Sequence, residues 1–105
     1  MYKVYRTQEF ENLLNKLLTK NDIGRVDKIE EEISEKGFTG KPLGYNFLRE
    51  KRINGKRAYF LVYEELKSAL MVSISDKNTQ QETIDKIKEY LPEFNRLMKE
   101  ISRST

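Results

Sequence analysis

The sequence predicts an α+β fold, in which an N-terminal strand and a helical hairpin precede a three-stranded antiparallel meander and a C-terminal helix. Three observations predict it: two apolar stripes at helical spacing before residue 37, three β-rich runs between residues 47 and 75, and a further helical stripe from residue 84. A length of 105 residues is enough for one domain and too short for two. We therefore expect residues 1–105 to form a single domain.

The first third of the chain is expected to form a short strand and two helices. Residues 2–6 alternate as a strand does, and Thr7 can cap the helix that follows. The apolar face of this helix recurs at steps of three and four residues and comprises Phe10, Leu13, Leu14, Leu17 and Leu18. Asn21 and Asp22 offer a new cap, and a second stripe comprises Ile23, Val26, Ile29 and Ile33. Gly37 ends this stripe, so the two helices form a hairpin.

The middle of the chain is expected to form the meander. Residues 39–46 contain Gly40, Pro42 and Gly44 and are predicted to be a loop. Residues 47–53, 57–64 and 69–75 are predicted strands, and the second has apolar residues on both faces, which is typical of a central strand. Asn54-Gly55 predicts a type I′ turn between the first two, because both residues tolerate positive φ.

The C-terminal segment is expected to be a helix that Pro92 kinks or restarts near Leu91. Thr79 and Glu82 fit a capping box at its start. Its apolar stripe comprises Ile84, Ile87, Leu91, Phe94, Met98 and Ile101. This stripe either packs on the sheet or the first helices, or forms a dimer seam.

The composition excludes several kinds of chemistry. The chain has no cysteine and no histidine, which excludes disulfides, the usual zinc sites, cysteine nucleophiles and histidine acid–base catalysis. We expect no cofactor and no metal. The N-terminal residues lack the apolar run of a signal peptide, and no stretch is long and apolar enough to span a membrane. A cytoplasmic location without a membrane partner is the default expectation.

Basic residues are concentrated in one segment of the chain. Residues 41–57 contain one acidic residue, Glu50, and six basic residues, which are Lys41, Arg49, Lys51, Arg52, Lys56 and Arg57. Six minus one gives this segment a charge of +5, so the rest of the chain sums to −2, since the whole carries +3. Such a patch indicates a surface that faces a polyanion. It is also what a strand at a sheet edge needs for protection against aggregation.

The strongest family signal is the hairpin of residues 47–63. Its sequence, FLREKRINGKRAYFLVY, resembles the middle strands of the RelE/ParE toxin superfamily, where a basic-x-basic strand and a glycine turn precede Tyr-Arg-Leu-Val-Tyr. The order and spacing of the predicted elements match this family over about residues 2–90. The resemblance implies a twisted antiparallel sheet with helices on one side and a concave basic face on the other.

The resemblance also implies site residues. Arg49 and Lys51 match the family's two basic residues on the first meander strand, and Lys77 lies where RelE-type members keep an arginine. These three are the predicted catalytic residues. The predicted nucleic-acid-binding residues are Arg49, Lys51, Arg52, Lys56 and Arg57. Phe60 stands in place of the family's mid-strand arginine, and Thr83 stands near the position of its catalytic tyrosine.

RelE-type toxins are ribosome-dependent endoribonucleases that cut mRNA, ParE-type toxins inhibit DNA gyrase, and an antitoxin holds both inactive. The resemblance therefore implies a toxin with a cognate antitoxin, and with the ribosome and mRNA as partners if it is RelE-like. The alternatives are a ParE-like or non-catalytic relative that acts by binding, and an interaction protein whose basic hairpin guards an edge. Without histidine, the general base would be Glu50, Tyr59, Tyr63 or a lysine. Tyr5, Tyr45 and Phe47 are candidates either for base stacking or for burial against the sheet.

Overall fold

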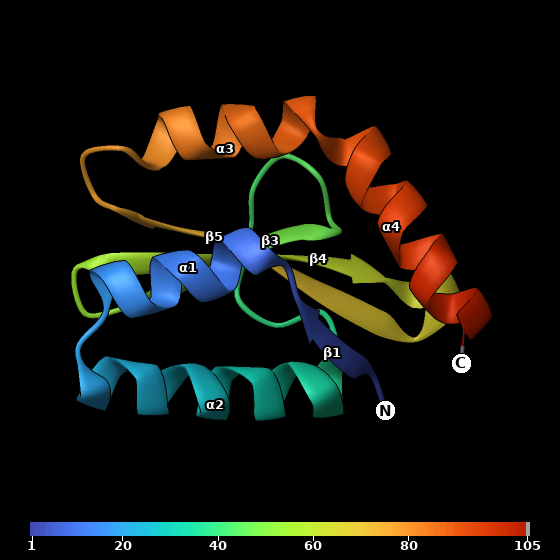
Figure 1. Cartoon of the computed structure of the whole chain (residues 1–105), viewed down its shortest axis with the longest axis horizontal. Coiled ribbons are helices and arrows are strands. Elements are labelled where there is room, and N and C mark those ends of the chain that lie inside the picture. The colour runs from blue at the N-terminus through green and yellow to red at the C-terminus, as the bar shows by residue number, and fades with distance from the viewer. Residues whose placement is uncertain (105) are drawn as a thin grey trace.

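The computed structural model describes residues 1–104 and confirms the α+β class and the predicted order of elements (Figure 1). The elements are β1 (Lys3–Arg6), α1 (Gln8–Leu17), α2 (Lys20–Lys36), β2 (Lys41–Pro42), β3 (Leu48–Ile53), β4 (Lys56–Tyr63), the 3-10 turn η1 (Glu64–Leu66), β5 (Ser68–Asp76), α3 (Gln80–Glu89) and α4 (Leu91–Ser104). No helix within residues 1–104 has the length and apolar character required to cross a membrane.

The strands form one sheet in the order β1-β5-β4-β3-β2. The predicted meander is β3, β4 and β5, which pair antiparallel. The fully antiparallel sheet that the resemblance implies is wrong in one respect, because β1 lies beside the last strand and runs parallel to it. The predicted loop of residues 39–46 is also partly wrong, since Lys41 and Pro42 pair with Glu50 and Arg49 as the short edge strand β2.

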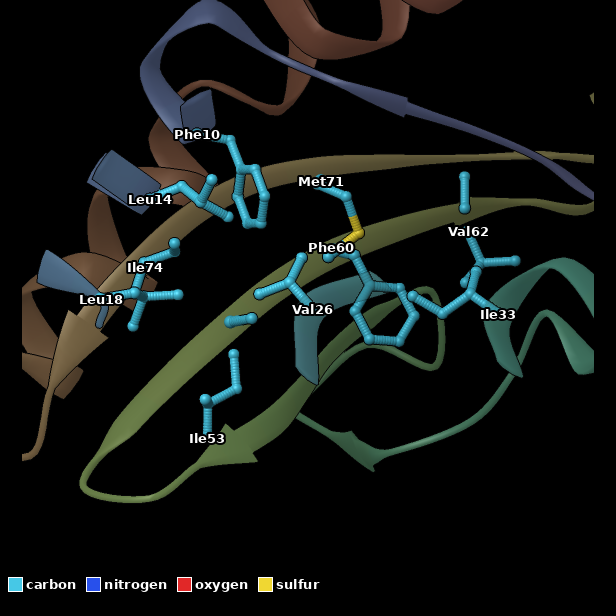
Figure 2. Packing of buried hydrophobic residues seen from close by; sticks show 12 residues of the cluster. Phe10, Leu14, Leu18, Val26, Ile33, Ile53, Phe60, Val62, Met71 and Ile74 are labelled. Atoms are coloured by element: carbon cyan, nitrogen blue, oxygen red, sulfur yellow. The ribbon is translucent and has the colours of Figure 1, made fainter. Parts of the chain in front are cut away.

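Helices cover both faces of the sheet, which corrects the expectation of helices on one side only. Helices α1 and α2 pack on one face, where Phe10, Val26 and Ile33 meet Phe60 and Met71 (Figure 2). On the other face, α3 and α4 contribute Ile84, Ile87 and Met98, which pack on Leu48, Tyr59, Leu61, Leu70 and Val72. The apolar stripe of the C-terminal segment therefore packs on the sheet. Both faces of β4 are buried, as its sequence predicts.

One of the three helix N-caps predicted from the sequence is confirmed, and two are wrong. Thr7 caps α1 by accepting from the Phe10 N–H at 3.0 Å, as predicted. The cap of α2 is Thr19 and not the predicted Asn21-Asp22, because Thr19 accepts from the Asp22 N–H. The capping box at Thr79 is also wrong, since the Thr79 hydroxyl donates to Asp76 Oδ1 at 3.1 Å and caps no helical N–H. A carboxylate one turn earlier has captured the hydroxyl.

Two further turns matter for the site. The β3–β4 hairpin has the predicted two-residue loop, since Ile53 pairs with Lys56. It is not type I′, because Asn54 takes φ 56° while Gly55 does not share a left-handed φ. The C-terminal helix breaks before Pro92, so that α3 ends at Glu89 and α4 starts at Leu91, as predicted.

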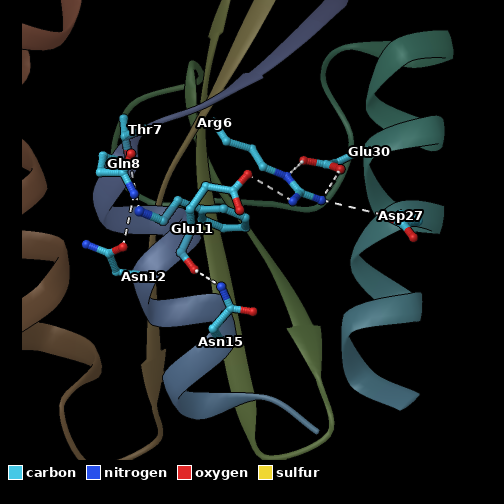
Figure 3. A network of polar contacts seen from close by, with 9 residues as sticks. Arg6, Thr7, Gln8, Glu11, Asn12, Asn15, Asp27 and Glu30 are labelled. Carbon is cyan, nitrogen blue, oxygen red and sulfur yellow. Dashed lines mark hydrogen bonds and ion pairs between the residues drawn. The ribbon is translucent and has the colours of Figure 1, made fainter. Parts of the chain in front are cut away.

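A polar network ties the first strand to the first two helices. The Arg6 guanidinium donates to both carboxylate oxygens of Glu30 at 2.7 Å, to Glu11 at 3.2 Å and to Asp27 at 3.5 Å (Figure 3). The carboxylates raise the pKa of Arg6, with the Glu30 hydrogen bond as the main cause. A bidentate, partly buried pair of this kind is the strong form of an ion pair. We assign this network to stability and not to function.

Candidate nucleic-acid interface at the hairpin end of the sheet

The alternation along β3 divides the basic residues between the two faces of the sheet. Arg49, Lys51 and the core residue Ile53 lie on the α1/α2 face, whereas Glu50 and Arg52 lie on the α3/α4 face. The sequence predicted that Arg49 and Lys51 share one face and that Glu50 faces away, and both statements are confirmed. The shared face, however, is the one that α2 covers.

Arg49 is nearly fully buried and holds the loop before β3. Its guanidinium donates to the carbonyl oxygens of Thr39 at 2.8 Å, Gly40 at 3.1 Å and Asn46 at 2.9 Å, and to the Asn46 side chain at 2.9 Å. It also lies over the ring of Phe38. A guanidinium whose donors already serve backbone carbonyls has little left for a phosphate. The catalytic role of Arg49 stays a prediction, and its contacts indicate a structural one.

Lys51 is paired within the protein. Its Nζ lies 2.8 Å from Glu32 Oε2 on α2, and Glu32 also accepts a hydrogen bond from Thr39. The hydrogen bond from Lys51, followed by that from Thr39, lowers the pKa of the Glu32 carboxyl. Its catalytic role also stays a prediction, and this pairing offers a structural alternative.

Replacing Glu32 with glutamine is expected to flatten the acid limb of the stability curve. The pKa of Glu32 in the folded protein lies below the ordinary 4.5, so the carboxylate adds stability above that pH and loses it as the pH falls through the folded-state pKa. We expect about 0.5 to 1 kcal/mol at neutral pH, because the pair is partly solvated. Urea unfolding at a series of pH values should show the gap to wild type closing in acid. Exposed Glu35→Gln is the control, and a gap independent of pH would contradict the assignment.

Four of the predicted basic residues meet at the hairpin end of the sheet. Arg52 and Arg57 are direct partners across β3 and β4, and Lys56 pairs with Asp76 on β5. Lys77 follows Asp76 in the exposed turn before α3, at the same end of the molecule (Figure 1). Like charges directly opposite each other destabilise a sheet. Among residues 1–104, neither Arg52 nor Arg57 has a carboxylate within salt-bridge distance.

Arg57 and Glu50 are buried with incomplete partners on the α3/α4 face. Arg57 is 6% exposed, and its Nη1 donates to the Gly55 carbonyl at 3.1 Å, while its Nε has no partner among the described residues. Glu50 is 2% exposed, and its carboxylate accepts one long hydrogen bond of 3.4 Å, from Gln80 of α3. Buried charges are normally paired or fully hydrogen-bonded. A buried group without a full set of partners requires an explanation, and a functional role is one such explanation.

Tyr59 lies between these groups. It lies directly across the strands from Glu50, and its hydroxyl shares a 2.7 Å hydrogen bond with Ser75. Burial raises its pKa, the Ser75 hydrogen bond lowers it, and the charges of Glu50 and Arg57 act in opposite directions. The phenol is therefore protonated at neutral pH. We call Glu50, Arg52, Arg57, Tyr59 and Gln80 the hairpin-end cluster.

The structure shows what surrounds Phe60 and Thr83, the two positions at which the sequence departs from the family pattern. Phe60 is fully buried in the α1/α2 core, on the opposite face from Arg57. Thr83 lies in the first turns of α3, where its hydroxyl donates to the Thr79 carbonyl at 2.8 Å. A side chain at position 60 cannot reach the hairpin-end cluster, whereas Arg57 brings a guanidinium to it. The hydroxyl of Tyr63, another candidate base, has no hydrogen-bond partner among the described residues, and burial raises its pKa.

The positions of the hairpin-end cluster residues on β3 and β4 follow from the sequence. A two-residue turn at Asn54-Gly55 fixes the register, so it places Arg52 opposite Arg57 and Glu50 opposite Tyr59. The position of Gln80 could not be predicted from the sequence, because only the packing of α3 on the sheet brings it to Glu50. No group of three or more metal-binding carboxylate, histidine or cysteine side chains occurs in the described part of the chain.

Solved structures share this architecture. The isolated RelE toxin of E. coli matches with a TM-score of 0.63 at 15% identity, over 83% of this chain and 99% of that one. The chain has the RelE fold. A RelE–RelB complex from Pyrococcus horikoshii (TM-score 0.62, 15% identity, 72% of this chain and 94% of that one) agrees. The RelBE2 toxin–antitoxin complex of Mycobacterium tuberculosis also agrees, with a TM-score of 0.61 at 19% identity, over 72% of this chain and 91% of that one.

The resemblance to the RelE/ParE superfamily is thus confirmed at the level of the fold. No protein-family model matches the sequence, and the curated proteins contain no match. At 15 to 19% identity the RelE fold says nothing by itself about activity. The function therefore has to be argued from the hairpin-end cluster.

Proposed function

We propose that the chain is the toxin of a toxin–antitoxin pair and that it cuts mRNA on the ribosome with the hairpin-end cluster. The observation that carries this proposal is the pair of opposed arginines, Arg52 and Arg57, beside the buried and poorly paired carboxylate of Glu50. Neither arginine has an acidic partner within residues 1–104, so a phosphate between them would relieve their repulsion. The RelE fold supports the toxin class.

The cluster contains the groups that cleavage by a ribose 2′-hydroxyl requires. Glu50 would accept the proton of the attacking hydroxyl, and Arg52 and Arg57 would stabilise the charge that develops on the phosphate. Tyr59 or exposed Lys77 would return a proton to the leaving oxygen. Because Gln80 contacts Glu50, the first turn of α3 has to move aside when RNA binds. This assignment replaces Arg49 and Lys51 as the catalytic residues and keeps Lys77.

The partners follow from the same proposal. Several solved neighbours are RelE toxins bound to RelB antitoxins, so a cognate antitoxin protein is the expected inhibitor. The ribosome and its mRNA are the expected target, and the cytoplasm is the expected location.

Glu50→Gln is expected to abolish cleavage while the fold is kept. The amide keeps the shape of the side chain but cannot accept a proton, and loss of a general base costs about 100- to 10,000-fold in rate. The measurement is induced expression of the chain alone, followed by mapping of mRNA 5′ ends in translating cells. Wild type should arrest growth and produce cuts in phase with codons, and Glu50→Gln should produce neither.

The neighbouring residue supplies the matched control. Lys51→Met changes the adjacent position on the opposite face of β3 and should leave the cuts in place. If Lys51→Met abolishes cutting and Glu50→Gln does not, the catalytic residues are those that the family resemblance implied. Circular dichroism of both variants would confirm that they are folded.

A second function, inhibition by binding alone, is favoured by one observation. Thr83 stands near the place of the family's catalytic tyrosine, and its hydroxyl is engaged by the helix backbone. A ParE-like gyrase inhibitor or a toxin without catalysis would need no such group. Growth arrest with intact mRNA and a DNA-damage response would support this function. Absence of any growth effect would contradict both toxin proposals.

A further inference from the structure

Two aromatic side chains lie stacked on the surface just before β3. Tyr45 and Phe47 have ring centroids 4.9 Å apart and planes inclined by 17°, yet they are 45% and 37% exposed. Aromatic pairs usually add their large apolar area to a core or an interface. This pair instead stays partly exposed, at the end of β3 that is remote from the hairpin.

The loop that carries the pair is rigid. Buried Arg49 donates to the carbonyl and the side chain of Asn46, which lies between the two rings in sequence. The backbone closes the loop as well, since Leu43 N–H donates to the Leu48 carbonyl at 2.9 Å and Leu48 N–H to the Tyr45 carbonyl at 3.3 Å. A surface held in one shape loses little conformational entropy when it binds. The contacts of Arg49 thus also fix the two rings.

Positive charge lies next to the pair. Lys88 of α3 places its Nζ 5.6 Å from the centroid of the Tyr45 ring. Gly44 leaves room for this ammonium, because a Cβ there would lie 3.2 Å from the Lys88 Nζ. Exposed Lys41 begins the same loop. No carboxylate lies within salt-bridge distance of Lys88 or Lys41 among residues 1–104, so both remain available to an anion.

A groove of about 380 Å³ opens beside Phe47. It is separate from the groove of about 490 Å³ between α1 and α3. Leu66 and Val62 line the groove beside Phe47 with apolar surface, and Asn95 and Lys99 of α4 add an amide and a cation. Its acidic residues are Glu64, which is paired with Lys67 and Tyr2, and exposed Glu65. Because Lys67 pairs with Glu64 and Lys99 lines the same groove as Glu65, the charges of the groove largely offset each other, and the cation beside the Tyr45 ring is Lys88.

We propose that Tyr45 and Phe47 form a stacking platform for unpaired bases of single-stranded RNA, with Lys88 as its phosphate contact. Stacking on aromatic rings beside a cation is how proteins hold single strands without reading their sequence. Bases within a duplex are already stacked on each other and cannot use such a platform. The inference extends the proposed action on RNA, because the platform would hold a part of the strand away from the hairpin-end cluster.

The test measures binding and not cleavage. The full chain carrying Glu50→Gln is titrated into a short single-stranded RNA that contains 2-aminopurine, whose fluorescence falls when the base stacks. Loss of one ring, in Tyr45→Ala or Phe47→Ala, should weaken binding roughly five- to 100-fold. Tyr45→Phe should bind like the parent, since it keeps the ring. Lys88→Ala should reduce the slope of log affinity against log salt by about 0.7.

Tyr90→Ala is the matched control, because Tyr90 is 44% exposed but lines the groove between α1 and α3. The proposal is overturned if Tyr45→Ala/Phe47→Ala binds the RNA as the parent does, or if duplex RNA binds equally well. Undiminished RNA binding together with lost antitoxin binding would assign the rings to the protein partner. This experiment measures neither growth nor cutting. A negative result would therefore contradict the platform and not the proposed function, and absence of cleavage would contradict the proposed function and not the platform.

Discussion

Phe60→Arg is expected to unfold the protein and not to restore an active-site cation. Phe60 is fully buried in the core cluster that includes Phe10 and Met71 (Figure 2). Removing a buried phenylalanine side chain costs about 3 to 5 kcal/mol, and burying an unpaired charge costs several more. The sum is comparable to the whole stability of a small domain, which is about 5 to 15 kcal/mol. Circular dichroism and urea unfolding of the purified variant measure the effect.

A conservative variant separates charge from size at this position. Phe60→Leu keeps an apolar side chain and should cost only about 1 to 2 kcal/mol. If Phe60→Arg were to fold with wild-type stability and to gain cleavage, position 60 would have to reach the α3/α4 face, and our assignment of Arg57 to that role would be wrong.

Arg49→Ala is expected to lower the free energy of unfolding by about 3 kcal/mol, because it leaves the buried Thr39 carbonyl and the partly buried Gly40 and Asn46 carbonyls without this donor. Arg49→Lys should recover little of this loss, since one ammonium cannot span carbonyls that the guanidinium fork reaches together. Urea unfolding measures both variants. Any loss of toxicity in Arg49→Ala should then follow the fraction of protein that is folded.

Arg52 supplies the comparison, because it lies on the same strand but is exposed. Arg52→Ala should change stability by less than about 0.5 kcal/mol, and should weaken RNA binding if the hairpin-end cluster is the interface. An Arg49→Ala variant with wild-type stability and no cutting would show that Arg49 acts in catalysis, as the family resemblance implied.

The arrangement of helices changes how the site has to work. With α3 and α4 on one face and α1 and α2 on the other, both faces of the sheet bury apolar side chains beneath helices. Of the predicted nucleic-acid-binding residues, exposed Arg52 and half-buried Lys56 lie at the hairpin end, where β3, β4 and the turn before α3 meet. In the proposed function, RNA would meet this end before the buried groups beneath Gln80.

Local patterns in the sequence were sufficient to predict the helices and the hairpin. Steps of three and four apolar residues located the helices, and Asn54-Gly55 located the hairpin, because both depend on interactions between near neighbours. The errors lie where a more distant group intervenes. Thr79 was expected to cap α3, but Asp76 takes its hydroxyl, and Lys41 and Pro42 become a strand only because β3 lies beside them.

Alternation along the strand was enough to predict that Arg49 and Lys51 share one face and that Glu50 lies on the other, since side chains alternate along any strand. Which helices cover each face follows from the tertiary packing. Both faces of this sheet are covered by apolar helices, so the pattern of the strand could not distinguish them. On one face, loop carbonyls accept from Arg49 and Glu32 of α2 pairs with Lys51; on the other, Glu50 has one long hydrogen bond from Gln80 of α3 and the Arg57 Nε has no partner among the described residues.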